Sequence, residues 1–236
     1  MTDAWFRARG CAAIAVLLVL GVVPARAEDR RVGAEALCVT NGAVSARPDG
    51  KLAIETPSSR GWVRGSDGQS AEIRFRYLGP SSGTKPLASG ELRRQIGIKL
   101  HAQDTCNLLY VMWHIEPDSR IAVSIKRNPN QHTHAECHAN GYTTLKPSIA
   151  MPQVVPGEAH SLRAELRGGE LTVLADGRRA WVGSIGGGLA GIEGPAGFRT
   201  DNARFEFEYF AKIADAVGPP RGAEQSRDRC VQQPGD

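Results

Sequence analysis

The chain has 236 residues with 29 basic and 25 acidic side chains, which leaves a formal net charge of +4. A balance this mild does not by itself imply a nucleic-acid partner. The length is enough to bury a sizeable core, and for an all-β chain it favours one large domain over two small ones.

The first 27 residues have the three parts of a cleaved secretory signal. Arg7 and Arg9 precede an uncharged apolar run over 11–23, and Ala25-Arg26-Ala27 forms a small-residue exit. The run is shorter than the roughly 20 residues that cross a bilayer as a helix. We therefore expect cleavage after Ala27, a periplasmic or secreted location, and a mature chain with no membrane attachment and a net charge of +2.

Four cysteines remain after cleavage, at Cys38, Cys106, Cys137 and Cys230. An even number in an oxidising compartment predicts two disulfides. Of the three possible connectivities we favour Cys38 with Cys230, which would tie the chain ends together, and Cys106 with Cys137, which would staple neighbouring strands. Free or differently paired thiols are the alternative.

Strand patterns begin after the first cysteine. Apolar and polar residues alternate over 71–78 and again over 95–101, which is typical of half-buried antiparallel strands. The segment 107–115 is apolar on both faces, so we expect it centrally in a sheet. It is followed by the turn residues 116–119 and a partner strand over 121–127, and together they predict a hairpin.

Further strands are predicted over 161–166, 170–175, 179–182 and 205–209, with turns at Gly168-Gly169 and Asp176-Gly177. Helix signals are almost absent, and neither an internal repeat nor a dividing linker is visible. We therefore expect an all-β fold, a two-sheet antiparallel β-sandwich or jelly roll spanning 28–214. The segment 215–236 is predicted to be a surface tail that Cys230 would hold.

The closing part of the predicted domain carries a recognisable series of turns and strands. Asp176-Gly177 is followed by the step Gly194-Pro195-Ala196-Gly197-Phe198-Arg199 and by the final strand Phe205-Glu206-Phe207. This series resembles concanavalin A-like lectin and glucanase domains, and within the segment it looks similar to laminin-G-like modules and the keto-disaccharide hydrolase family. The resemblance implies a jelly roll in which one sheet curves into a groove for polysaccharide. Such turns indicate fold more than activity.

Polar residues on the strands between 71 and 127 would share one face if all their apolar rows point into the core. The candidate ligand-binding residues on that face are Arg74, Arg76, Gln95, Lys99, His101, Tyr110, His114 and Lys126. Arginine pairs with carboxylate or sulfate through two parallel hydrogen bonds, so a basic groove of this kind indicates an anionic sugar chain. An ordinary solvated sheet face is the alternative.

An enzyme on the same fold is the second hypothesis. A polysaccharide lyase needs groups to neutralise a carboxylate and to move a proton, and Arg76, Gln95, His101 and Tyr110 are of the right types. Their order departs from the motifs of alginate lyases of this fold. The Glu-x-Asp-x-x-Glu strand of the glucanases is absent from the sequence, so we assign no catalytic residue. A laminin-G-like protein-interaction module is the third hypothesis.

Two remaining motifs receive structural interpretations. His132, His134 and His138 form the densest group of potential metal ligands, but the preferred use of Cys137 in a disulfide favours a polar loop at a groove rim, and we expect no metal or cofactor. The glycine-rich segment 186–191 has no strand-to-helix unit around it and is expected to be a β-loop. The leading hypothesis is an exported carbohydrate-binding jelly roll whose partner is a glycan rather than a nucleic acid.

Overall fold

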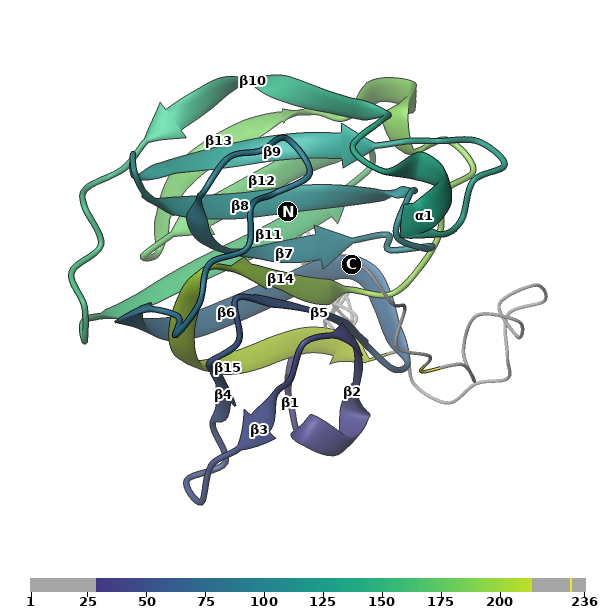
Figure 1. The fold of residues 1–236 in the computed structure, drawn as a ribbon. Helices are drawn as coiled ribbons and strands as arrows, with labels where there is room; N and C mark the ends of the chain where they lie inside the picture. The colour runs from purple at the N-terminus through teal and green to yellow at the C-terminus, as the bar shows by residue number, and fades with distance from the viewer. Residues whose placement is uncertain (1–28, 214–229, 231–236) are drawn as a thin grey trace, which may run out of the picture.

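The computed structural model describes residues 29–213 and Cys230. The predicted signal peptide and most of the predicted tail lie outside the described residues. The described chain forms two antiparallel sheets stacked face to face as a β-sandwich (Figure 1), which confirms the predicted fold class. No helix among the described residues is both long and apolar enough to cross a membrane.

We call the larger sheet, with eight strands, sheet A. In spatial order it contains β13 (Arg178–Ser184), β12 (Glu170–Ala175), β11 (Ala159–Arg167), β6 (Ser66–Pro80), β15 (Ala203–Ile213), β4 (Leu52–Ile54) and β3 (Ser45–Ala46), with β1 (Arg30–Val32) paired to β15. The hairpin predicted around Gly168-Gly169 is present as β11 and β12, with Leu166 opposite Leu171.

The second sheet, sheet B, has seven strands. In spatial order it contains β10 (Tyr142–Ala150), β9 (Arg120–Lys126), β8 (Leu108–Glu116), β7 (Arg94–Leu100), β14 (Gly197–Asp201), β5 (Ser58–Val63) and β2 (Leu37–Asn41). The predicted hairpin of 107–127 is present as β8 and β9, and β8 lies inside the sheet as its apolar character indicated. Short helical turns occur at η1 (Ala34–Ala36), α1 (His134–Cys137) and η2 (Gly186–Leu189), the last within the glycine-rich segment that was expected to be a β-loop.

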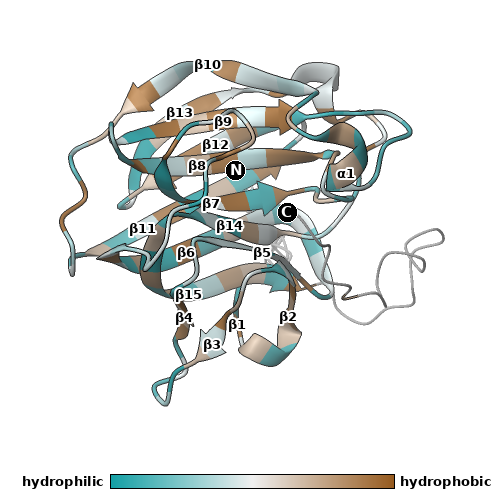
Figure 2. Cartoon of the chain, viewed as in Figure 1, coloured by the Kyte–Doolittle hydropathy of each residue, from teal (hydrophilic) through white to brown (hydrophobic). Residues whose placement is uncertain are grey.

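The core lies between the sheets and is built from the apolar row of each strand. Phe75 of β6 meets Trp113 of β8 edge to face across the interlayer, with ring centroids 5.6 Å apart, and Phe205 of β15 packs against the same Phe75 ring. Offset and edge-on aromatic contacts of this kind add to the stabilisation from burial alone. Figure 2 shows apolar and polar segments alternating along many of the strands, as expected when one face of each is buried and the other carries polar groups.

Two disulfides join parts of the described chain. Cys38 of β2 is bonded to Cys230, and Cys106, just before β8, is bonded to Cys137 of α1. These are the two pairings favoured from the sequence. The first closes a loop over a sequence separation of 192 and the second over 31, so both restrict the unfolded chain.

Candidate functional site

The outer face of sheet B carries polar side chains in rows that cross the strands. Because side chains alternate along a strand, residues aligned by register on neighbouring strands point to the same side. One row contains Ser58, Asp201, Gln95, His114 and Arg120; the next contains Arg60, Arg199, Gly97, Met112 and Ala122; the third contains Trp62, Gly197, Lys99, Tyr110, Ser124 and Thr144. Figure 1 shows the strands that carry these rows side by side.

A pocket of about 240 Å³ opens on this face. Its floor comes from β5, β14, β7, β8 and β9, and its two walls come from the segment 85–88 and from His134 and His138 around α1. Tyr142, at the start of the edge strand β10, lies on its rim and is 41% exposed. The charged and polar lining residues are Ser58, Arg60, Lys85, Lys99, Thr105, Tyr110, Lys126, Arg199 and Asp201, together with the three residues just named.

Two arginines and one carboxylate form the charged centre of the pocket floor. Arg199 Nε lies 2.7 Å from Asp201 Oδ2, and Arg60 Nη2 lies 3.6 Å from Asp201 Oδ1. Gln95 Nε2 donates a third bond, 2.6 Å long, to Asp201 Oδ2. Burial alone would raise the pKa of Asp201, but the neighbouring Arg199 and Arg60 hold it below its ordinary value. The carboxylate is therefore ionised and engaged in orienting both guanidinium groups.

Two tyrosines stack beside these arginines. The rings of Tyr110 and Tyr142 lie 6.0 Å apart with an interplanar angle of 24°. The guanidinium of Arg199 lies 5.4 Å from the Tyr110 ring centroid, and Lys126 Nζ lies 5.3 Å from that of Tyr142. Cations at these distances are attracted to the ring faces. Tyr110 is buried, which raises the pKa of its hydroxyl, whereas Tyr142 offers part of its ring to solvent.

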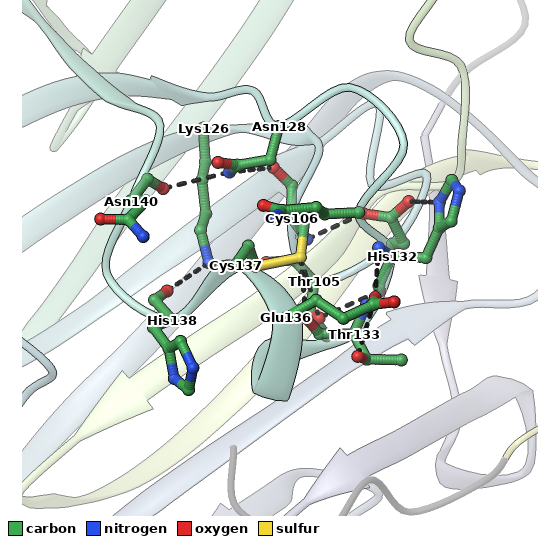
Figure 3. Close-up of a disulfide and its surroundings, with 12 residues drawn as sticks. Thr105, Cys106, Lys126, Asn128, His132, Thr133, Glu136, Cys137, His138 and Asn140 are labelled. Carbon is green, nitrogen blue, oxygen red and sulfur yellow. Dashed lines mark hydrogen bonds and ion pairs between the residues drawn. A yellow bond between two sulfur atoms is a disulfide. The ribbon is translucent and has the colours of Figure 1, made fainter.

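Lys126 holds the wall around α1 in place. Its side chain is buried, and its Nζ donates to Thr105 O at 3.1 Å and to His138 O at 2.9 Å (Figure 3). The same nitrogen lies 3.1 Å from Cys137 Sγ in the disulfide. A buried ammonium needs several acceptors to offset its loss of hydration, and the two loops that meet at the disulfide supply them. Lys126 thus joins the end of β9 to both loops.

Hydrogen bonds of Asn128 and Glu136 also hold the wall around α1 in place. The Nδ2 of Asn128 donates to Cys106 O and Asn140 O, at 3.1 and 3.0 Å (Figure 3). Glu136 accepts from the backbone N–H groups of His132 and Thr133, forming with Thr133 a capping box at the start of α1. These backbone bonds lower the pKa of Glu136 to about 2.

His114 lies at the opposite end of the face, between two arginines. Its Nε2 is 3.1 Å from Arg93 Nη1, and its Nδ1 accepts from Arg120 Nε at 3.1 Å. Burial, together with the positive charges of Arg93 and Arg120, lowers the pKa of His114 to about 3. A neutral imidazole accepts at one ring nitrogen and keeps its proton on the other, so a second proton would set an N–H group against an arginine donor at both nitrogens.

The structure places five of the eight sequence-predicted ligand residues on this face: Gln95, Lys99, Tyr110, His114 and Lys126. Three of these, Lys99, Tyr110 and Lys126, line the pocket. The expectation of a common face is wrong for Arg74 and Arg76. They lie on β6 in sheet A, because the chain passes from one sheet to the other between Pro80 and Arg94.

The three misplaced candidates have other contacts. Arg74 Nε lies 2.6 Å from Glu72 Oε1, and its guanidinium stacks 4.4 Å from the Phe210 ring centroid. Arg76 donates to the carbonyl of Gly157. His101 follows the last residue of β7 with φ of +49°, which turns it out of the row, and its Nδ1 contacts Ile192 O at 3.0 Å. The lyase constellation of Arg76, Gln95, His101 and Tyr110 is therefore not assembled.

Sequence reasoning missed the most strongly charged part of the site. Arg199 ends the step 194–199, whose turns indicate fold more than activity, but Arg199 and Asp201 alternate with the buried Phe198 and Thr200 and so belong to an outward-facing row. Arg60 and Tyr142 carry no comparable signal, because β5 and β10 lack regular alternation in the sequence. Only their register with β14 and β9 reveals that they join the face.

The histidine cluster is part of the wall. His132 Nδ1 is bonded to Asp104 Oδ2 at 2.8 Å, and the rings of His134 and His138 lie 6.1 Å apart in an edge-on contact. Within residues 29–213, no three His, Cys, Asp or Glu side chains are grouped so as to hold a metal ion.

No protein-family model matches the sequence, and no curated protein matches it. Solved structures do match. A carbohydrate-binding module, CBM66 from Bacillus subtilis, aligns with 73% of this chain and 91% of its own at 14% identity and a TM-score of 0.52. A Bacillus subtilis protein of unknown function with a galectin-like fold aligns with 75% of this chain and 88% of its own at 11% identity and a TM-score of 0.50. At these identities the comparisons show fold alone: the chain shares a two-sheet antiparallel β-sandwich with these two structures.

Proposed function

We propose that the protein binds a glycan in the pocket on the outer face of sheet B. The observation that carries the proposal is that one pocket combines a partly exposed aromatic ring at its rim, Tyr142, with buried, hydrogen-bonded polar groups on its floor. A sugar ring presents apolar C–H groups on its faces and hydroxyls at its rim, so it needs both kinds of surface. The fold shared with a carbohydrate-binding module supports the proposal as an analogy.

The groups in the pocket favour binding over the two enzymatic alternatives. A lyase would require a tyrosine or histidine that exchanges a proton near neutral pH, and burial disfavours Tyr110 in that role because it raises the pKa of the hydroxyl. A retaining glycosidase would require two carboxyls about 5 Å apart, one of which is protonated at the start. Asp201 is held ionised by Arg199 and Arg60. Its role is to orient those arginines rather than to move protons.

The proposal also concerns the cellular compartment in which the protein acts. The two disulfides fit an oxidising environment outside the cytoplasm, as does the predicted signal segment. We infer that the mature protein acts in the periplasm or after secretion, where polysaccharides are accessible. Protein recovered from a bacterial host in the periplasmic fraction, with Glu28 as its first residue, would support this inference; full-length protein retained in the cytoplasm would contradict it.

A glycan array followed by calorimetry tests the proposed binding. We expect the purified protein to bind a subset of polysaccharides, and Tyr142→Ala to raise the Kd at least about tenfold, equivalent to about 1.4 kcal/mol. Tyr142→Phe keeps the ring and should change the Kd less than about threefold. Val182→Ala is the control, since Val182 is 42% exposed, almost the same as Tyr142, but lies on β13 of sheet A.

Two outcomes would refute the proposal. One is the absence of binding to every neutral and acidic glycan on the array. The other is an equal loss of affinity in Tyr142→Ala and Val182→Ala when circular dichroism shows both variants folded, which would place the contact away from sheet B.

A further inference from the structure

We propose that the pocket selects glycans whose sugar ring carries an anionic group, a carboxylate or a sulfate, and that Arg60 and Arg199 recognise it. This inference rests on the proposed glycan binding and adds the chemical class of the ligand. It follows from the charge of the pocket, the arrangement of its two guanidinium groups and its size.

The pocket carries an excess of positive charge. In the part of the chain that the structure describes, five basic side chains line it, Arg60, Lys85, Lys99, Lys126 and Arg199, against one lining carboxylate, that of Asp201. Charge of one sign in a pocket with partly desolvated walls attracts a ligand of the opposite sign more strongly than the same charge on an open surface.

The two arginines are already held in position for a ligand. Their side chains are 13% and 11% exposed, and both contact Asp201. Arg60 Nη1 also donates to Ser58 Oγ at 2.9 Å. Among the described residues, these contacts use two of the five N–H groups of Arg60 and leave donors for an incoming oxyanion. Because Asp201 fixes both guanidinium groups before binding, little side-chain entropy is lost when the ligand arrives.

Among the described residues, Asp201 is the one carboxylate that pairs with Arg60 and with Arg199, so these three side chains together carry one net positive charge. Arg60 and Arg199 are directly paired across β5 and β14, so their guanidinium groups face the same side and would repel each other without Asp201. A second anion in the pocket would complete the neutralisation. A neutral sugar would instead leave these buried donors to be satisfied by hydroxyl groups, which are weaker acceptors than a carboxylate or a sulfate.

The volume limits how much of a chain enters. At about 240 Å³ the pocket is smaller than the roughly 300–1,000 Å³ of sites for drug-sized ligands. It therefore suits one substituted sugar ring rather than several. Tyr142 on the rim can support that ring or its neighbour while the acidic substituent reaches the arginines below. The remaining units of the chain would extend along the outer face of sheet B.

The test compares ligands that differ only in charge. Calorimetry with the purified protein would measure the Kd for trigalacturonic acid, its methyl ester, a neutral galactotriose and a sulfated galactotriose. We expect the acid, the sulfated sugar or both to bind at least about tenfold more tightly than the ester and the neutral sugar. The preference should shrink when NaCl rises from about 0.05 to about 0.5 M, because salt screens the attraction. Preference for the acid identifies a uronate pocket and preference for the sulfated sugar a sulfate pocket.

Substitutions test which side chain produces the preference for the anionic ligand. Arg60→Gln removes one guanidinium but leaves the closer Arg199–Asp201 pair, and it should abolish the acid-over-ester preference. Arg60→Lys keeps the positive charge but lacks the planar guanidinium, so it should retain part of the acid-over-ester preference. Arg74→Gln, on the outer face of sheet A, is the control and should change neither the Kd of the acid nor the Kd of the ester. If Arg60→Gln fails to fold, the ligand series on the wild type still decides the ligand class.

The failures of the two proposals are distinguishable. Equal binding of the charged and neutral trisaccharides would overturn the anionic class, and an undiminished preference in Arg60→Gln would overturn recognition by Arg60. Both results leave glycan binding intact. No binding to any trisaccharide or to any glycan on the array would overturn glycan binding itself.

Discussion

The neutral His114 makes a quantitative prediction about stability in mild acid. Its pKa is about 3 in the folded protein, whereas an imidazole in an unfolded chain has a pKa of about 6.5. Below about pH 6.5 the unfolded state therefore binds a proton that the folded state does not, and the free energy of unfolding falls as the pH falls. The loss continues until the pH approaches the folded pKa. From about pH 7 to about pH 5 this one group should cost about 2 kcal/mol.

The perturbation is His114→Gln, which removes the titrating ring and keeps an acceptor for Arg93 or Arg120. Guanidinium unfolding of wild type and variant at several pH values gives both free energies. We expect the wild type to lose about 2 kcal/mol more than the variant between about pH 7 and about pH 5. If the free energy of unfolding falls equally with pH in the wild type and the variant, the reasoning is refuted. A ring-nitrogen NMR shift showing a cationic His114 at about pH 5 would refute it as well.

Two further substitutions test how the walls of the pocket are built. Lys126→Met removes a donor from the buried carbonyl of Thr105 and from the carbonyl of His138, and it should lower the free energy of unfolding by about 3 kcal/mol. Lys212→Met, on the half-exposed end of β15, should change it by less than about 0.5 kcal/mol in the same denaturant titration, and similar effects of the two substitutions would contradict the role of Lys126. Asn202 has φ of +57°, and its side chain is hydrogen-bonded to the backbone of residues 85 and 93. Asn202→Gly should therefore lower the free energy of unfolding by about 2 kcal/mol, and Asn202→Ala by about 1 kcal/mol more, because alanine is strained at a positive φ. An Ala variant as stable as the Gly variant would show that the positive φ carries no strain.

Alternation along single strands predicted much of the sandwich. It separates inward from outward residues within a strand, and for β7, β8 and β9 this is sufficient because those strands are neighbours. It does not say which sheet a strand joins. Arg74 and Arg76 do face outward, as their alternation indicates, but β6 pairs with β11 and β15 on the far side of the core. Assigning strands to sheets requires long-range pairing, which a single sequence does not display.

Only part of the candidate site could be predicted, because the rest depends on long-range strand pairing. Lys99 and Tyr110 come from adjacent strands with clear periodicity, whereas Arg60 and Arg199 meet only because β5 and β14, over a hundred residues apart in the sequence, are paired. The structural role of Lys126 was also hidden. Its position in the outward row indicated a ligand contact, but the acceptors that surround its ammonium come from two loops joined by the disulfide.

A crystal structure of the protein with the oligosaccharide of lowest Kd is the most direct test of glycan binding on sheet B. The account predicts one sugar ring in the pocket, against Tyr142, with an oxyanion within hydrogen-bond distance of Arg60 or Arg199. An oligosaccharide bound on the outer face of sheet A, beside Arg74, would contradict it.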